Sequence, residues 1–273
     1  MFDFLDFAFN QRALLAVLMI GFSNGALGSL VVLRKNALVI SALSHSLLQG
    51  IALAMLVFGG MNPFVGLFGA LCSALLVGLG TVVVARKGLL DHQTALSVLY
   101  TSAFAGGLLL LSRLPGNVEL ESWLFGNVLG LRNMDLWMSY AVSLVILFLL
   151  AWFRRDWILY LFEPSVAASM GVPVGRLNYL LTGLMVLALV TSLQAVGAVL
   201  SAALFIIPTA TMLQWVHSPR ALIWSSGGLG VLAGILAVFL SNWWNVQTGA
   251  TLILLLGCAF LFSLLVKDLR QRS

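Results

Sequence analysis

The sequence predicts an all-α fold, a polytopic bundle of eight or nine transmembrane helices. Only 8% of the 273 residues are charged and 61% are hydrophobic, whereas soluble domains carry about 25% charged residues. The mean hydropathy is +1.08, and apolar runs of about 20 residues, the length of a membrane-crossing helix, recur along the chain. The polar segments between them are too short for a soluble domain, so we expect one transmembrane domain over residues 1–273.

The first part of the chain is expected to cross the membrane four times. Basic pairs, Arg34-Lys35 and Arg86-Lys87, end the first and third spans, and a turn at residues 59–63 separates the second span from the third. After the fourth span, residues 118–126 predict a short interfacial helix with Trp123 and Phe125 at the level of the lipid headgroups. The four spans are residues 12–33, 37–58, 64–85 and 94–112.

The second part of the chain contains the remaining spans. Residues 134–153 form the fifth, and residues 177–215 can hold two spans divided near Ser192-Leu193-Gln194. Because this stretch is barely long enough for two spans, a re-entrant hairpin is an open alternative. Residues 221–240 and 248–266 form the last two spans.

Residues 163–171 predict a short helix outside the membrane. Pro164 stands near its start, where a missing N–H has no consequence, and Gly171 follows its last turn, where a positive φ is needed. Such a segment is either an ordinary connector or a docking point for another protein. The sequence has no G-x-x-x-x-G-K-[ST] loop, so an ATP-driven transporter of this kind needs an ATPase on a separate chain.

The basic residues predict the orientation in the membrane. Of the 14 Lys and Arg residues, Arg12, Arg113 and Arg132 lie on one side, which leaves 11 on the other. Because positive loops are retained in the cytoplasm, we expect the N-terminus outside and the C-terminus in the cytoplasm, as an odd number of spans requires. Small basic clusters between apolar runs report orientation and give no indication of nucleic-acid binding. The cytoplasmic set is Arg34, Lys35, Arg86, Lys87, Arg154, Arg155, Arg176, Arg220, Lys267, Arg270 and Arg272.

One polar stripe lies within the second span. Ser41, His45 and Gln49 recur at i, i+4 and i+8, so on a helix they share one face. All acidic residues fall in loops or at span ends, which makes His45 the sole ionisable side chain well inside a span. A histidine at this depth is costly unless it faces a bundle interior or an aqueous cavity, and such residues are functional by default.

A neutral imidazole is a common ligand of first-row metals, and the oxygens of Ser41 and Gln49 could complete a weak site from which a metal can leave again. The alternative is a histidine that hydrogen-bonds a neighbouring helix and fixes packing only. A hydrolase built on His45 with Ser44 or Ser46 is disfavoured, because adjacent side chains on a helix point apart.

Several short segments along the chain are informative as a set. They are LGSLVVLRK at 27–35, ALSHS at 42–46, SWLFGNVLG at 122–130, Glu163-Pro164 with GVPV at 171–174, SLQAVGAVL at 192–200, IIPTAT at 206–211 and TGAT at 248–251. In this order they resemble the permease subunits of ABC-type zinc, manganese and iron importers, the ABC-3 family. The likeness covers nearly the whole chain.

This resemblance implies a homodimeric or paired permease in a bacterial cytoplasmic (inner) membrane. An ABC ATPase would dock on each cytoplasmic face, and an extracytoplasmic solute-binding protein would deliver the substrate. The chain would be a transport subunit and not an enzyme, with no tightly bound cofactor, and a divalent metal (Zn, Mn or Fe) would pass between two permease chains. His45 falls on the metal-contacting histidine of the family, with Ser41, Ser44 and Gln49 around it. The segment with Glu163, Pro164, Ser165, Ala168 and Gly171 falls on its coupling helix.

The stripe departs from the family at two positions. The family usually has an Asp where this chain has Ser41, and many members have a Pro at the position of Gln49. Without that carboxylate, a divalent cation in a low dielectric lacks a compensating charge. The site is then weaker, or the acid comes from a second, non-identical permease chain, or the substrate is a chelated metal or another small solute. A secondary transporter or channel that works without ATP is a further alternative.

Overall fold

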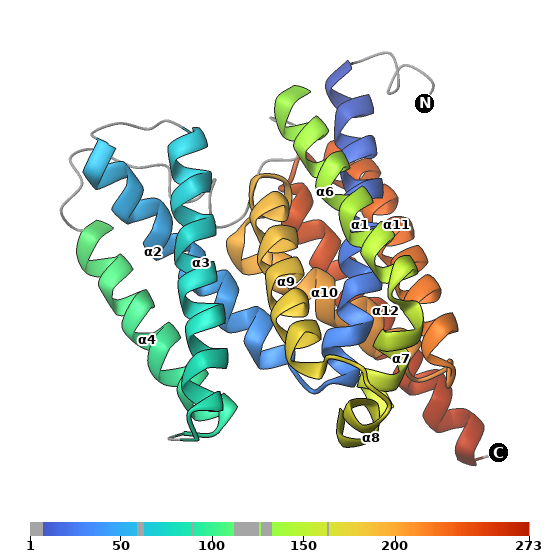
Figure 1. Ribbon diagram of the computed structural model, residues 1–273. Coiled ribbons are helices and arrows are strands. Elements are labelled where there is room, and N and C mark those ends of the chain that lie inside the picture. Colours follow the sequence, from blue (N-terminus) through green and yellow to red (C-terminus); the bar gives the residue numbers. More distant parts are fainter. Residues whose placement is uncertain are drawn as a thin grey trace.

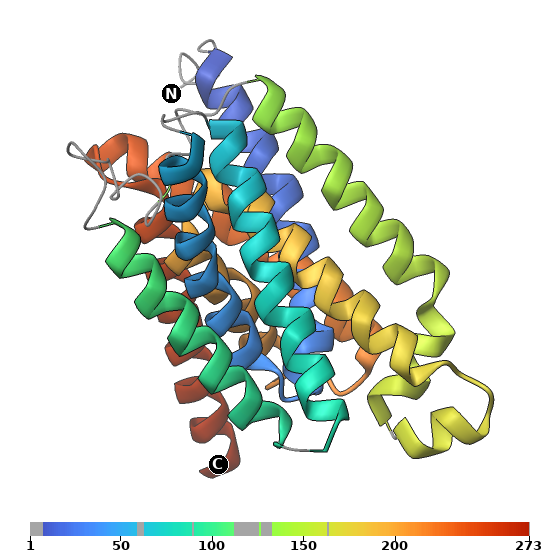
Figure 2. The ribbon, with the colours of Figure 1, turned by 60° about the vertical axis from the view of Figure 1, so that its left-hand side comes forward.

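The computed structural model describes residues 8–58, 63–88, 90–111, 126, 133–162 and 164–272, and the regular structure in these residues is helical, as the sequence predicts (Figure 1). The long helices run side by side along the same general direction, in both views of the molecule (Figure 2). The helices are α1 (Ala8–Leu33), α2 (Ala37–Phe58), α3 (Pro63–Arg86), α4 (His92–Leu111), α6 (Asn133–Trp152), α7 (Arg154–Phe162), α8 (Pro164–Ser169), α9 (Val174–Val196), α10 (Ala198–Met212), α11 (Pro219–Trp244) and α12 (Thr248–Arg272).

Among the described residues, 7 helices are long and apolar enough to cross a membrane, namely α1, α2, α3, α6, α9, α11 and α12. The chain is therefore a multi-pass membrane protein, and the expected eight or nine spans slightly exceed this number. The 20-residue α4 packs along α2 and α3. The 15-residue α10 reaches about 22 Å at 1.5 Å per residue, which is less than the bilayer core of about 30 Å.

The stretch at residues 177–215 is divided into two helices, as expected, but the break falls at Gly197, later in the chain than the division expected near Ser192-Leu193-Gln194. Ser192 stays within α9 because its hydroxyl donates to the carbonyl of Ala188 at 2.6 Å, which satisfies it without ending the helix. Gly197 has a φ of 91°, a conformation that glycine adopts readily. The interfacial helix expected at residues 118–126 lies outside the described residues, except for Gly126.

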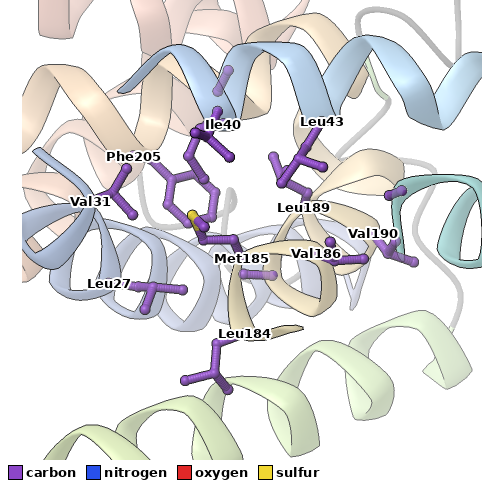
Figure 3. Close-up of a cluster of buried hydrophobic side chains, with 14 of the residues drawn as sticks. Leu27, Val31, Ile40, Leu43, Leu184, Met185, Val186, Leu189, Val190 and Phe205 are labelled. Atoms are coloured by element: carbon purple, nitrogen blue, oxygen red, sulfur yellow. The ribbon is translucent and has the colours of Figure 1, made fainter. Parts of the chain in front are cut away.

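The core is shared by helices that are far apart in the sequence. Leu27 and Val31 come from α1, and they pack in one hydrophobic cluster with residues of α2, α9 and α10. Figure 3 shows this cluster, with side chains that are at most 1% exposed: Leu27, Val31, Ile40, Leu43, Met185 and Phe205. α2, which carries the polar stripe, is therefore anchored along its inner face.

Glycines allow α1 to pack directly against its neighbours. A Cβ on Gly25 would lie 2.5 Å from the backbone oxygen of Ser226 on α11, and one on Gly28 would collide with the backbone of Phe205 on α10. Without a hydrophobic driving force in lipid, such close backbone approach is a main source of helix association. The small residues at 21–25 of α1 therefore form a helix–helix contact.

α2, α3 and α4 form a group of neighbouring helices at one side of the molecule, on the left in Figure 1. A Cβ on Gly50 of α2 would collide with the backbone oxygen of Gly69 on α3. On the other side of α2, a Cβ on Gly107 of α4 would lie 2.8 Å from the Cα of Gln49. Glycines thus set the distances between these three helices.

α7 and α8 lie at the end of the molecule where α12 finishes, opposite the first turn of α1 (Figure 1). The turns after α1 and α3, the start of α9 and the last turns of α12 are at this same end in both views (Figure 2). They carry most of the basic residues that the sequence assigns to one side, including Arg34, Arg86, Arg154 and Arg176. The short helix expected after Glu163 is present as α8, and Glu163 itself lies outside the described residues.

We predict that Gly25→Ala destabilises the protein by about 1–3 kcal/mol, the usual range for overpacking, because the new methyl group meets backbone atoms that cannot rotate away. Gly257→Ala in α12 is the matched control, since no atom lies within 4 Å of a Cβ at that position. Thermal unfolding in detergent checks the difference. Equal melting temperatures for the two variants would contradict this account of the α1–α11 contact.

Candidate functional site

The polar stripe of α2 lies on its less covered face. Ser41, His45 and Gln49 are half-buried, whereas the side chains between them are fully buried, including Leu43 and Leu47. The same face continues to Leu38, which is 64% exposed, and to Leu53, which is 48% exposed. The helical periodicity therefore placed these three polar residues on one face correctly.

His45 is bordered by two aromatic rings from α4. Its ring centroid lies 5.6 Å from that of Phe104, with the rings edge to face, and 6.4 Å from that of Tyr100, with the rings stacked. Among the described residues, no hydrogen bond reaches either imidazole nitrogen. The alternative of a histidine hydrogen-bonded to a neighbouring helix finds no support here, and both nitrogens remain available to a ligand.

The two serines near His45 differ in orientation. The hydroxyl of Ser44 is turned inward, is 1% exposed, and donates to the backbone carbonyl of Ser41 at 2.7 Å. The Ser41 hydroxyl makes no hydrogen bond with the described residues and lies on the open face. The structure thus brings Ser41 and His45 onto one face and leaves Ser44 outside it.

Gln49 lies where α2, α3 and α4 meet. The hydroxyl of Ser73 on α3 is within 3.2 Å of its Oε1 and within 2.9 Å of the backbone carbonyl of Ser46. On the opposite side, Gly107 of α4 packs directly against the Gln49 backbone. Gln49 is therefore held by α3 and covered by α4, one turn from His45.

A pocket of about 530 Å³ opens between the same three helices, beginning at Gln49. Its walls are mainly apolar, with polar groups from Gln49, Ser73 and Ser102 and the thiol of Cys72. His45 does not line it. Sequence reasoning did not single out Ser73 or Ser102, because a serine within an apolar run is commonly satisfied by its own helix.

The outer face of α4 is rich in hydroxyl groups. Thr94, Ser97, Thr101 and Ser102 are all exposed, and Ser97 and Ser102 donate to carbonyls of their own helix. The exposed face of α6 instead carries large side chains such as Trp137 and Phe148, which suit lipid. The exposed face of α4 also carries Val98, but with these hydroxyl groups it is more polar than the exposed face of α6. The spacing of Thr94, Ser97 and Thr101 at i, i+3 and i+7 is the signal that could have found it.

The described residues contain no group of three or more His, Cys, Asp and Glu side chains that could hold a metal ion. One chain offers a single imidazole with the oxygens of Ser41 and Gln49 nearby on the same helix. Such an arrangement can bind a metal weakly, and further ligands must come from water or from another chain.

α8 is fixed by one buried residue and otherwise faces outward. Ala167 is fully buried, whereas Ser165, Ala168 and Met170 are exposed. Gly171 ends the segment with a φ of 82°, and the N–H of the next residue, Val172, donates to the carbonyl of Ala167 at 3.0 Å. Of the expected coupling residues, Pro164 is half-buried, and Glu163 lies outside the described residues.

Comparison with known proteins identifies the relatives of the chain. The family model of the ABC 3 transport family matches residues 6–267, which confirms the resemblance seen in the sequence. The manganese import system permease protein ScaB of Streptococcus gordonii is 33% identical, over 96% of this chain and 92% of that protein. The probable iron transport system membrane protein of Haemophilus influenzae is 32% identical, over 100% of both chains.

Solved structures show the same fold. PsaBC from Streptococcus pneumoniae, in complex with Fab, superposes with a TM-score of 0.83 at 30% identity, covering 96% of this chain and 94% of that one. An inward-facing conformation of a putative metal-chelate type ABC transporter gives a TM-score of 0.76 at 18% identity, covering 94% and 85%, which supports the fold alone.

We predict that single cysteines introduced by Ser41→Cys, His45→Cys and Gln49→Cys react with a small water-soluble thiol reagent much faster than one introduced by Ser44→Cys. The first three positions are half-buried on the open face, and the fourth is turned into the core. The background carries Cys72→Ser and Cys258→Ser, and mass spectrometry follows the modification. Equal rates at positions 44 and 45 would contradict the orientation of the stripe.

Proposed function

Because the chain belongs to the ABC 3 transport family, we propose that it is the membrane permease of an ABC importer that moves a divalent transition metal into the cytoplasm. Manganese and iron are named for the relatives, and zinc has the same preference for imidazole ligands. The N-terminus lies outside and the C-terminus lies in the cytoplasm of a bacterial inner membrane, since the basic residues gather at the end that holds α8.

The observation that carries this proposal is the environment of His45. An imidazole within a membrane-spanning helix, with both nitrogens free of hydrogen bonds to described residues, is a costly arrangement unless something binds it. A neutral imidazole suits Mn, Fe and Zn, and the hydroxyl and amide oxygens of Ser41 and Gln49 supply hard ligands on the same face. The donors are few and uncharged, so the metal binds weakly and can be released.

A second permease chain, identical or a paralogue, completes the pathway. The stripe and the hydroxyl-rich face of α4 belong to neighbouring helices, and Tyr100 and Phe104 of α4 lie beside His45. Across a two-fold axis the same patch meets itself, so each His45 would be matched by the histidine of the other chain. Two imidazoles with several oxygens provide enough ligands for a transition metal in transit.

A chelated metal or another small solute is the second candidate substrate. The observation that favours it is Ser41, because an uncharged residue beside His45 leaves a bare divalent cation without a compensating charge in a poorly hydrated site. A chelate carries its own negative groups and needs less charge from the protein. Transport without ATP is disfavoured, since the family to which the chain belongs is that of ABC transporters.

Energy for transport comes from a separate ABC ATPase that docks on α8, and an extracytoplasmic solute-binding protein delivers the metal. The exposed side chains of Ser165, Ala168 and Met170 and the fixed backbone at Gly171 form a small docking surface at the basic end of the bundle. Pro164 starts the helix and Glu163 precedes it. The permease chain itself catalyses no hydrolysis.

We predict that His45→Ala lowers metal uptake by at least about tenfold. This is the smaller end of the losses in affinity or activity that mutations around metal sites cause. The chain is reconstituted in liposomes with its ATPase and binding protein, and uptake of Mn²⁺, Zn²⁺ and Fe²⁺ is measured. Ser44→Ala is the matched control, because its hydroxyl is turned away from the stripe. Unchanged uptake of all three metals in the His45 variant would rule out a metal contact.

Ser41→Asp in the same assay separates the two substrate candidates. A bare ion gains a compensating charge, so the variant retains Mn²⁺ more tightly in equilibrium binding. For a chelate, the added charge repels the ligand, and transport falls while free Mn²⁺ binding stays the same.

We predict that Gly171→Val weakens association with the ATPase, because a β-branched residue in the left-handed region costs of order 1–3 kcal/mol and would reorient the end of α8. The side chain itself has room, since no atom lies within 4 Å of a Cβ there. Gly88→Val, in the turn after α3, is the matched control, because Gly88 has a φ of 71° and a Cβ there also has no atom within 4 Å. Copurification of the ATPase with the tagged permease is the measurement, and equal recovery with both variants would exclude docking through this segment.

A further inference from the structure

We propose that Arg34 and Arg86 are positioning residues that transmit the movement of α8 to the stripe of Ser41, His45 and Gln49 on α2. This inference rests on the proposed function, in which an ATPase docks on α8 and the stripe contacts the metal. Arg34 lies in the turn after α1 and contacts α7, and Arg86 is the last residue of α3 and contacts α9. α7 and α9 precede and follow α8 in the chain.

Arg34 joins the start of α2 to α7, the helix before α8. Its guanidinium carbon lies 4.2 Å from the ring centroid of Tyr160, and its Nη1 is 3.4 Å from the backbone oxygen of the same residue. Its Nε is buried and has no hydrogen-bond partner in the described part of the chain. The side chain is therefore held mainly by stacking on the ring, which a planar guanidinium does well.

Tyr160 is itself held in place, so a shift of α7 would carry the ring on which Arg34 stacks. The Tyr160 side chain is 1% exposed, and its hydroxyl donates to Oδ1 of Asn178 on α9 at 3.1 Å. Burial raises the pKa of Tyr160, so the phenol keeps its proton and remains a donor. One turn earlier, the indole N–H of Trp157 donates to the carbonyl of Leu149 on α6 at 3.3 Å.

Arg86 makes the corresponding contact on the other side of α8. Its guanidinium carbon lies 4.5 Å from the ring centroid of Tyr179 on α9, the helix that follows α8. The guanidinium also lies against Gly175, where a Cβ would collide with Nη2. The helix that precedes α8 in the chain thus carries the contact of Tyr160 with Arg34, and the helix that follows it carries the contact of Tyr179 with Arg86.

Both arginines are connected to the stripe of Ser41, His45 and Gln49. Arg34 is joined to α2 through Lys35 and Asn36, so its displacement acts directly on the helix that carries Ser41 and His45. Arg86 ends α3, and from that helix the Ser73 hydroxyl binds Oε1 of Gln49 and the carbonyl of Ser46. A helix moves as a rigid element over such distances, so a shift of α8 reaches the stripe by two routes.

The test measures coupling in the assembled transporter. Arg34→Lys and Arg86→Lys keep the charge that orients the chain but lose the planar contact with the rings. With ATPase and binding protein in liposomes, Mn²⁺ uptake and ATP hydrolysis are measured in the same vesicles. We expect ATPase association and basal ATP hydrolysis to remain at the wild-type level. The amount of Mn²⁺ transported per ATP should fall about fivefold or more, the size of typical coupling effects between distant sites. Arg155→Lys, an exposed neighbour, should leave the ratio unchanged.

Variants of the partner ring separate transmission from simple stability. Tyr160→Leu removes the ring and should match Arg34→Lys, whereas Tyr160→Phe keeps the ring and should retain most of the ratio. Arg34→Lys combined with Tyr160→Leu should be no worse than either change alone, because both break one contact. If one variant is too unstable to purify, Arg86→Lys tests the second route independently.

An unchanged Mn²⁺-to-ATP ratio in both Arg34→Lys and Arg86→Lys would overturn the inference, and so would a loss of thermal stability with no change in the ratio. Either result leaves the proposed function intact, provided that the wild type imports Mn²⁺ and His45→Ala does not. Failure of the wild type to import Mn²⁺, Zn²⁺ and Fe²⁺ would instead refute the proposed function, and normal ATPase binding by Gly171→Val would refute docking on α8.

Discussion

The structure depends on one constraint, which is that a bilayer core offers no water to polar groups. Most hydroxyls within the spans meet this constraint locally, as Ser29, Ser44 and Thr81 do by donating to carbonyls of their own helices. The Ser41 hydroxyl and the His45 imidazole are different, since neither has a hydrogen bond within the described residues. Their position requires water, an ion or a partner, and this requirement is the physical basis for a substrate pathway along α2.

Close packing through glycine determines what surrounds that pathway. Gly50 and Gly69 bring α2 and α3 into backbone contact, and Gly107 brings α4 against Gln49. Only at such short distances can Tyr100 and Phe104 of α4 cover His45. Aromatic rings lower the local dielectric constant, and a charged ligand would therefore bind a metal ion very strongly there. The uncharged ligands Ser41, His45 and Gln49 keep metal binding reversible.

The basic residues at one end of the bundle serve two purposes. Their number sets the orientation in the membrane, and this does not depend on where each side chain points. The contacts of Arg34 with Tyr160 and of Arg86 with Tyr179 do depend on it, because they tie the turns of the bundle to the helices flanking α8. Lysine would satisfy the first purpose but not the second.

Hydropathy and the helical period are local properties of a chain. The helical class, most span positions, the short helix at α8 and the common face of Ser41, His45 and Gln49 could therefore be predicted from the sequence alone. It placed the α9–α10 break too early, since hydroxyls such as that of Ser192 are satisfied inside the helix and Gly197 provides the turn. Contacts between helices place α4 beside His45, turn Ser44 inward and bring Arg34 onto Tyr160, and none of these could be predicted from the sequence. A helical period tells which residues share a face, but the helix that packs on that face is chosen by contacts far along the chain.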